Sequence, residues 1–301
     1  MSVDRVAVDA MGGDHAPAAI VAGAVLAARE HGIAVTLVGR RDVVERHLAD
    51  AGGTDVVAVV DAPDVVGMDE DPVAALRAKP GCSVRVACQL IADGAAGSVV
   101  SAGSTGATLT AALLTLGRLP GVRRPVVAAV VPLTGGRRFV LLDAGGTADA
   151  QADAFRGYTL MGAAYAEVLG VGQPSVGLLN IGTEAGKGNA VAKEAYELLD
   201  GTSGFVGNVE PADVFAGTVD VVVTDGFTGN VFLKTIEALA PVDEATADAA
   251  ALVLGVGGEV FVAHGSAGAD QVVRAVARAA TVGKAGLASL VGRRLAKKET
   301  V

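Results

Sequence analysis

Tryptophan is absent from this chain and aromatic residues make up only 3% of it, although 51% of its 301 residues are hydrophobic. The core must therefore be built mainly from Ala, Val and Leu, and the 41 glycines are expected largely in turns. No apolar run approaches the roughly 18 residues that a membrane-spanning helix needs. The stretch Met1–Arg5 has neither the basic nor the apolar region of a signal peptide, so we expect a soluble, cytoplasmic protein.

Cysteine and basic residues are also scarce. Cys82 and Cys88 are the only cysteines and have no Cys or His cluster near them, which excludes a disulfide framework and a zinc site and favours reduced thiols. The net charge of −9 argues against a dedicated nucleic-acid binder.

Short β-branched runs alternate with helical segments along the whole chain. This alternation predicts an α/β fold with a largely parallel sheet covered by helices on both faces. We expect one domain over residues 1–301, either as one large unit or as two lobes around a central cleft. Among the helices, an Ala-rich one is predicted at Ala238–Leu254, and Ser83 is predicted to cap another.

Six predicted strands end in a polar residue that glycine follows closely. In open α/β sheets, ligands bind beyond the carboxyl ends of the strands, so the six loops are predicted to line one cleft. The six residues are Asp9, Ser101, Asp143, Asn180, Asp225 and His264.

Two of these loops carry lysine. The strand Val221–Val223 is followed by a Gly-rich turn at 225–230, and a helix predicted from Val231 would place Lys234 in its first turn. Free N–H groups at a helix N-terminus and a nearby lysine favour an anion. Lys187 lies in a similar loop, although each lysine taken alone also fits an ordinary surface position.

Other motifs are excluded by spacing. No G-x-G-x-x-G follows the first strand, and no G-x-S-x-G is present. The loop 182–188 is one residue too short between its glycines for a nucleoside triphosphate loop and has Gly188 where Ser or Thr must hold magnesium. His15 and His264 fit either a proton donor or a structural histidine. The strand-end aspartates fit helix caps better than metal ligands, so no metal is predicted.

In their order along the chain, several motifs resemble those of the PlsX family, the acyl-carrier-protein:phosphate acyltransferases. They are Val8–Pro17, Ser101–Ala107, Leu179–Glu184 with Lys187–Asn189, Asp225–Asn230 with Leu233–Lys234, and His264–Ser266. The resemblance implies a three-layer α/β/α fold similar to isocitrate and isopropylmalate dehydrogenases and phosphotransacetylase, in a homodimer without a cofactor. It implies transfer of a fatty acyl group from acyl carrier protein to inorganic phosphate, giving acyl phosphate for phospholipid synthesis.

The resemblance also implies roles for individual residues. The catalytic candidates hold phosphate, stabilise the oxyanion or protonate the leaving thiolate, and they are Lys187, Lys234, Asn230 and His264. The substrate-binding candidates are Asp9, Gly12, Gly13, Asp14, His15, Ser101, Gly103, Ser104, Thr105, Gly106, Asn180, Gly182, Asn189, Asp225, Gly226 and Gly229. An acidic carrier protein is expected to dock on the arginines of the 118–138 run, namely Arg118, Arg123, Arg124, Arg137 and Arg138.

This chain departs from the family at several positions. Ser104 stands where the family typically has Asn, and residues 143–147 (Asp-Ala-Gly-Gly-Thr) lack another expected amide. The segment 236–258 is much shorter than the family's long amphipathic helices, so membrane contact does not follow. Two alternatives therefore stay open: a phosphotransacetylase-like enzyme that uses an acyl coenzyme A, and a catalytically silent module that binds acyl carrier protein.

Overall fold

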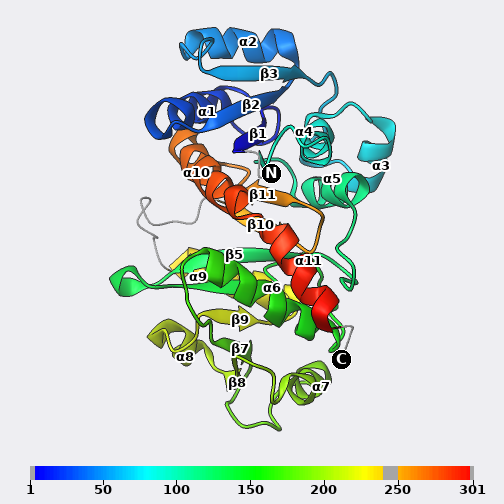
Figure 1. The fold of residues 1–301 in the computed structure, drawn as a ribbon, viewed down its shortest axis with the longest axis vertical. Helices are drawn as coiled ribbons and strands as arrows, with labels where there is room; N and C mark the ends of the chain where they lie inside the picture. Colours follow the sequence, from blue (N-terminus) through cyan, green and yellow to red (C-terminus); the bar gives the residue numbers. More distant parts are fainter. Residues whose placement is uncertain (1–3, 240–249, 299–301) are drawn as a thin grey trace. The chain divides into compact units, whose positions relative to one another are not determined.

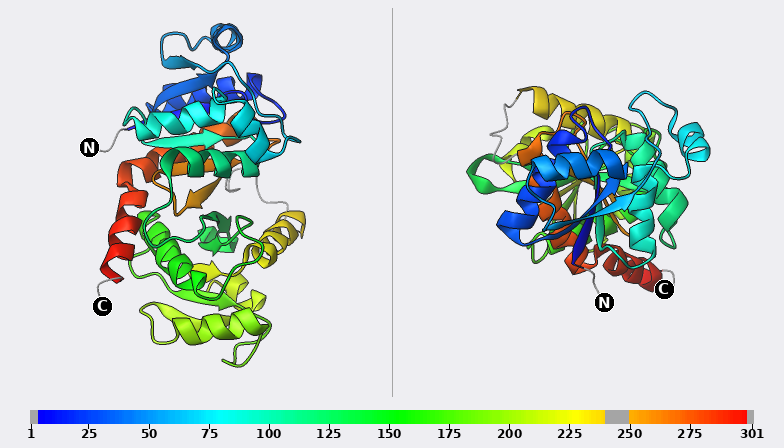
Figure 2. Two further views of the ribbon diagram at one scale, coloured as in Figure 1. Left: turned by 90° about the vertical axis from the view of Figure 1, so that its right-hand side faces the viewer. Right: turned by 90° about the horizontal axis from the view of Figure 1, so that it is seen from above.

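The computed structural model describes residues 4–239 and 250–298, and these form two compact units (Figures 1 and 2). Among the described residues, the first unit comprises 4–117 and 250–288, and the second comprises 118–239 and 289–298. Each unit has its own strands and its own covering helices.

The sheet of the first unit is parallel except at one edge. Its strand order is β3-β2-β1-β4-β11-β10, and only β10 runs antiparallel, against β11. The strands are β1 (Arg5–Asp9), β2 (Ala34–Gly39), β3 (Val57–Asp61), β4 (Ser98–Ser101), β10 (Ala250–Leu254) and β11 (Glu259–Ala263).

Helices cover both faces of this sheet. On one face α1 (Ala18–His31) packs along α10 (Ala269–Ala285), with α2 (Arg41–Asp50) beside α1. On the other face lie α3 (Pro72–Ala78), α4 (Ser83–Ala92) and α5 (Thr105–Leu116). The close packing of α1 on α10 depends on Gly23, because a Cβ there would lie 2.5 Å from the carbonyl oxygen of Ala269.

The second unit repeats this plan. Its strand order is β5-β6-β9-β7-β8, and only β5 runs antiparallel, against β6. The strands are β5 (Val126–Pro132), β6 (Arg138–Leu142), β7 (Val176–Leu179), β8 (Phe205–Val209) and β9 (Val221–Val223), and a 3₁₀ turn lies at Thr134–Gly136. The helices are α6 (Ala154–Val168), α7 (Ala190–Leu199), α8 (Pro211–Ala216) and α9 (Gly226–Leu239). A last helix, α11 (Leu287–Lys298), begins in the first unit and continues with residues of the second.

The predicted α/β class with helical layers on both faces of a largely parallel sheet is confirmed. Central strands such as β4 and β9 are buried at every residue, as apolar strands covered on both faces must be. Both cysteines are free and buried, and burial raises the pKa of the Cys88 thiol to about 12. Among the described residues, no helix is long and apolar enough to cross a membrane.

Three local predictions are wrong. The predicted helix at Ala238–Leu254 fails at its end, because Ala250–Leu254 is the strand β10; residues 240–249 of that prediction lie outside the described residues. The helix predicted from Val231 begins at Gly226. Ser83 lies inside α4, whose N-cap is Cys82, so its hydroxyl is free for another role.

Candidate functional site

Three neighbouring parallel strands of the first unit end at the same edge of the sheet. Asp9 ends β1, Ser101 ends the adjacent β4, and His264 directly follows β11. The register pairs Asp9 with Ser101 and Ser101 with Val262, so the residues predicted at these strand ends are brought side by side.

The buried Asp9 carboxylate links the loops at this edge of the sheet. It is 3% exposed and accepts hydrogen bonds from the Ser101 hydroxyl at 2.7 Å and from the N–H of Met11 at 3.1 Å. Burial raises the pKa of Asp9 above its ordinary value, while hydrogen bonds from Ser83 and Ser101 oppose that rise. A buried carboxylate with these partners fixes the two loops rather than meeting a ligand directly.

Glycine allows the loops to approach one another closely. A Cβ on Gly12 would lie 2.6 Å from the backbone nitrogen of Gly103, and Gly13 has a φ of +107°. The Gly103 N–H donates to the Ser101 hydroxyl at 3.1 Å, and the Asp14 N–H donates to the Gly265 carbonyl at 2.8 Å. The loops after β1, β4 and β11 thus pack backbone against backbone.

The start of α5 offers open donors at this edge. Ser104 is the N-cap of α5 but makes no side-chain capping bond. Among the described residues, no acceptor contacts the N–H groups of Thr105 and Gly106, which an α-helix leaves without an internal partner. These groups and the Ser104 hydroxyl could hold an anion.

His264 is exposed, and its Nδ1 lies 2.9 Å from the Ser266 hydroxyl. That contact orients the ring and leaves Nε2 as the nitrogen for a substrate. Asp14 and His15 are also exposed, on the neighbouring loop.

In the second unit, Asp143 follows β6 and is fully buried. One of its oxygens, Oδ1, accepts the N–H groups of Val127, Gly145 and Gly146 at 3.0, 3.1 and 2.7 Å, and Oδ2 accepts that of Thr147 at 2.6 Å. Burial raises the pKa of Asp143 above its ordinary value, and the four N–H donors oppose that rise. The carboxylate therefore shapes the loop 143–147 as a core element.

The first turn of α9 packs directly on this loop. A Cβ on Gly229 would lie 2.0 Å from the carbonyl oxygen of Asp143, and one on Gly226 would lie 2.6 Å from that of Thr147. The Asn230 amide donates to the Ala144 carbonyl at 3.0 Å. Asn230 thus ties helix to loop, and its second amide N–H and its carbonyl oxygen remain for other partners.

Three N–H groups of this turn, those of Gly226, Thr228 and Gly229, already have acceptors. Gly226 donates to the Thr147 carbonyl at 2.9 Å, and Thr228 donates to the Asp225 carboxylate at 2.9 Å. Asp225 itself thus occupies the helix N-terminus where the sequence predicts an anion. Because α9 begins at Gly226, the exposed Lys234 lies beyond its second turn, and its predicted place in the first turn is wrong.

The loop after β7 is held by a pair of asparagines. The buried Asn180 donates to Asn208 Oδ1 at 3.0 Å and to the Lys187 carbonyl at 3.1 Å, and Asn208 donates to the Glu184 carbonyl at 2.8 Å. Gly188 has a φ of +95° and lies against the Asn180 amide.

The predicted ligand groups on this loop differ in their availability. The Lys187 ammonium is half exposed, 3.8 Å from Glu184. Asn189 caps α7 through the Ala192 N–H at 2.9 Å. Gly182 is buried beneath the Lys187 side chain. Lys187 is therefore the group of this loop with a charge to offer.

The five arginines of the 118–138 run lie at the two ends of β5. Arg118, Arg123 and Arg124 precede β5, at the end near Asp143, whereas Arg137 and Arg138 lie at the far end, because Pro132 pairs with Arg138. Arg137 binds the carbonyls that end α8, and Arg138 binds that of Leu169 after α6. The five arginines therefore do not form a single surface.

At the near end of β5, Arg123 pairs with Asp153 at 2.8 Å, and Arg118 binds the Arg123 carbonyl at 2.5 Å. Arg124 is exposed, and no hydrogen bond or ion pair engages it among the described residues.

Two residues that support the sites from within could not be recognised in the sequence. Ser83 donates to Asp9, and Asn208 pairs with Asn180. Asp143 is among the six predicted strand-end residues, but its role in binding four N–H groups was not predicted. Within residues 4–239 and 250–298, no group of three or more His, Cys, Asp or Glu could hold a metal ion.

Similarity to solved structures concerns the fold. A phosphotransacetylase from Streptococcus pyogenes superposes with a TM-score of 0.70 over 93% of both chains at 18% identity. A 4-hydroxythreonine-4-phosphate dehydrogenase from Burkholderia phymatum superposes with a TM-score of 0.54, covering 92% of this chain and 98% of the other at 17% identity. The α/β architecture is thus shared with enzymes of different chemistry.

Sequence similarity is much closer. The family model described as "Fatty acid synthesis protein" matches residues 4–250. A phosphate acyltransferase from Desulforamulus reducens is 48% identical over 240 residues, covering 78% of this chain and 71% of that protein. One from Thermus thermophilus is 46% identical over 325 aligned positions, covering 97% of this chain and 98% of that protein. That alignment exceeds the 301 residues of this chain, so the Thermus protein has residues that this chain lacks. The chain therefore belongs to the PlsX family of phosphate acyltransferases, as its ordered strand-end motifs predict.

Proposed function

We propose that this protein transfers a fatty acyl group from the thioester of acyl carrier protein to inorganic phosphate. Family membership makes the chain an acyltransferase that acts on phosphate, and the carrier-bound fatty acyl donor is the finer part of the proposal. The observation that carries it is the retention of the family's glycine loops at the strand ends of both units, with open N–H donors at α5.

The reaction needs positioning and charge stabilisation rather than a protein nucleophile. A phosphate oxygen attacks the thioester carbonyl carbon, forming a C–O bond, and the tetrahedral oxyanion collapses as the C–S bond breaks. The leaving thiolate takes up one proton. The products are acyl phosphate and the free thiol of the carrier.

The described side chains suit separate parts of this reaction. Ser104 and the N–H groups of Thr105 and Gly106 are candidates for holding an anionic oxygen, and His264 Nε2 is a candidate for protonating the thiolate. Lys187 and Lys234 remain the proposed cationic ligands of phosphate or of the oxyanion. Asn180, Asn189 and Asn230 hold the backbone in place, so their proposed contribution is indirect.

The carrier is proposed to dock near the start of β5. Acyl carrier proteins are acidic, and Arg118, Arg123 and Arg124 lie there together, with Arg124 exposed. A homodimer, a cytoplasmic location and supply of acyl phosphate to phospholipid synthesis are further parts of the proposal, carried by the family resemblance.

Comparison of two donors tests the carrier. Palmitoyl-acyl carrier protein and palmitoyl-coenzyme A are each supplied with inorganic phosphate, and thiol release and acyl phosphate are measured. We expect the carrier-bound donor to be preferred. The variant Arg124→Glu should raise KM for that donor, more strongly at low salt, and leave the coenzyme A donor unaffected. A preference for coenzyme A would overturn the carrier part of the proposal and support a phosphotransacetylase-like enzyme instead.

A further inference from the structure

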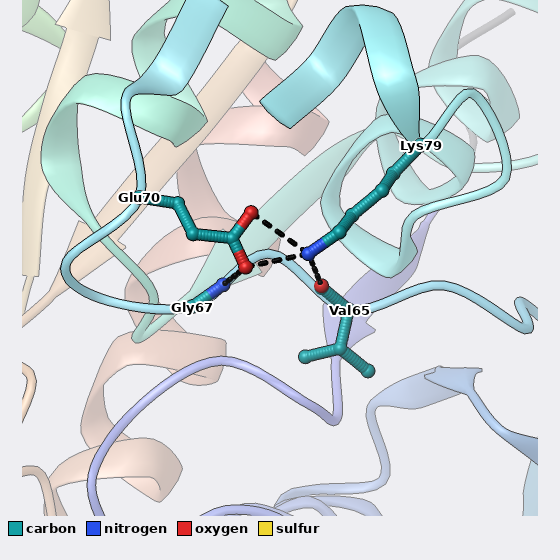
Figure 3. Close-up of polar contacts among 4 residues, drawn as sticks. All are labelled: Val65, Gly67, Glu70 and Lys79. Carbon is teal, nitrogen blue, oxygen red and sulfur yellow. Dashed lines mark hydrogen bonds and ion pairs between the residues drawn. The ribbon is translucent and has the colours of Figure 1, made fainter. Parts of the chain in front are cut away.

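One lysine binds both ends of the loop 65–70 of the first unit, and we call these contacts the Glu70–Lys79 brace. Lys79, at the end of α3, contacts both carboxylate oxygens of Glu70 at 2.5 and 2.7 Å and the carbonyl of Val65 at 2.8 Å (Figure 3). The Gly67 N–H donates to the same carboxylate at 3.2 Å. Both ends of the loop are thus fastened to one ammonium group.

This braced loop lies against the candidate site of the first unit. The methyl carbon of Met68, Cε, lies 3.0 Å from where a Cβ on Gly265 would be, so the side chain rests on the loop that carries His264. Pro72, just beyond the brace, lies 2.8 Å from the corresponding position on Gly106. The segment 65–72 therefore reaches both the His264 loop and the start of α5.

Met68 is an apolar side chain in a polar setting. Four large hydrophobic side chains are exposed among the described residues of the first unit: Val56, Met68, Val73 and Leu114. Met68, which is 43% exposed, lies against the strand-end loop that carries His264. A flexible thioether suits an apolar ligand of variable shape.

We propose that Met68 is a specificity-determining residue whose side chain contacts the acyl chain of the donor, and that the Glu70–Lys79 brace holds it there. This inference rests on the proposed function, since it needs a fatty acyl substrate. The hydrophobic contact would add to donor binding and would not involve phosphate.

Variants of graded apolar size test the contact, with palmitoyl-acyl carrier protein and phosphate as substrates. Met68→Ala should raise KM for the donor about fourfold, which corresponds to the burial of about one methylene group, and leave KM for phosphate unchanged. Met68→Leu should restore the donor KM, because its volume is similar. Val73→Ala, a change at a side chain of 45% exposure on α3, is the matched control and should change neither constant.

The brace has a readout that does not depend on activity. Glu70→Gln and Lys79→Gln should raise the donor KM in the same direction and speed thermolysin cleavage within residues 65–70, whereas Met68→Ala should leave cleavage slow. An unchanged donor KM in Met68→Ala would overturn the inference, and so would a rise in the phosphate KM together with the donor KM. Either result leaves the proposed function in place as long as the wild-type protein forms acyl phosphate. Absence of acyl phosphate from the wild-type protein would overturn the proposed function, and this inference with it.

Discussion

Gly229 and Gly157 are both helical glycines of the second unit. Their replacement by alanine is expected to change the stability of the protein in opposite directions. In Gly229→Ala, the new methyl group would lie 2.0 Å from the carbonyl oxygen of Asp143 and 3.0 Å from its carbonyl carbon. These are backbone atoms held by the core, so α9 must move away by about 1 Å or more to reach an ordinary contact.

The cost can be estimated from what that movement disturbs. Overpacking costs about 1–3 kcal/mol. The hydrogen bonds Gly226–Thr147 and Asn230–Ala144, at 2.9 and 3.0 Å, would lengthen, at roughly 1 kcal/mol each. A loss of about 3–5 kcal/mol should lower the thermal midpoint of unfolding by about 10 °C. Gly157, in α6, meets only the Met161 methyl carbon at 4.0 Å, so Gly157→Ala should raise the midpoint by about 2 °C, because alanine favours the helix by about 0.5–1 kcal/mol.

Circular dichroism melts of the wild-type protein and both variants measure these shifts, and an acyl phosphate assay on the same samples reports the effect on the site. A Gly229→Ala variant with an unchanged midpoint and unchanged activity would refute the close approach of α9 to the loop 143–147. A strongly destabilised Gly157→Ala variant would show that open space around a helical glycine does not decide whether alanine raises or lowers the thermal midpoint.

Two further changes probe buried polar groups. Glu259 accepts the Ala288 N–H at 3.0 Å, and burial raises its pKa above the ordinary 4.5. Its contribution to folding stability is therefore complete below pH 4.5, the ordinary pKa, and is lost as pH rises through the raised pKa of the folded protein. Glu259→Gln keeps an acceptor without the charge and should flatten the fall of the melting temperature as pH rises above 4.5; an unchanged slope would contradict this assignment. Asn180→Ala should cost about 1–3 kcal/mol in urea unfolding, because Asn208 and the Lys187 carbonyl lose a donor. A double-mutant cycle with Asn208→Ala should give a coupling above about 0.5 kcal/mol, and strict additivity would count against the pair.

The strands could be predicted because their signal is local. Val221–Val223 is a short apolar run between turn residues, and it forms a strand with those bounds. Ala250–Leu254 was missed because its alanines favour a helix locally, although the Gly-rich residues 255–258 that join it to its antiparallel partner β11 are a hairpin signal.

The predicted site residues fall into two physical classes that sequence alone does not separate. Asp9 and Asn180 are buried and hold loops together, whereas Lys187 and His264 are exposed. The difference comes from contacts between distant segments, such as the 92 residues that separate Asp9 from Ser101. The start of α9 was placed too late because glycine has a low helix propensity, and the need for close packing on the loop 143–147 overrides it.

Acyl phosphate is the product that defines the proposed function, and hydroxylamine traps it as a hydroxamate that can be measured. Palmitoyl-acyl carrier protein and inorganic phosphate are incubated with the wild-type protein, Lys187→Ala, Lys234→Ala and the control Lys193→Ala, which alters an exposed lysine on α7. We expect hydroxamate from the wild-type protein and from the control, and a loss of about 100-fold or more in the other two variants, as removal of one transition-state ligand causes. Full activity in Lys187→Ala and Lys234→Ala would contradict the proposed ligands. No hydroxamate from the wild-type protein with any acyl donor would contradict the proposed acyl transfer to phosphate and favour a silent carrier-binding module.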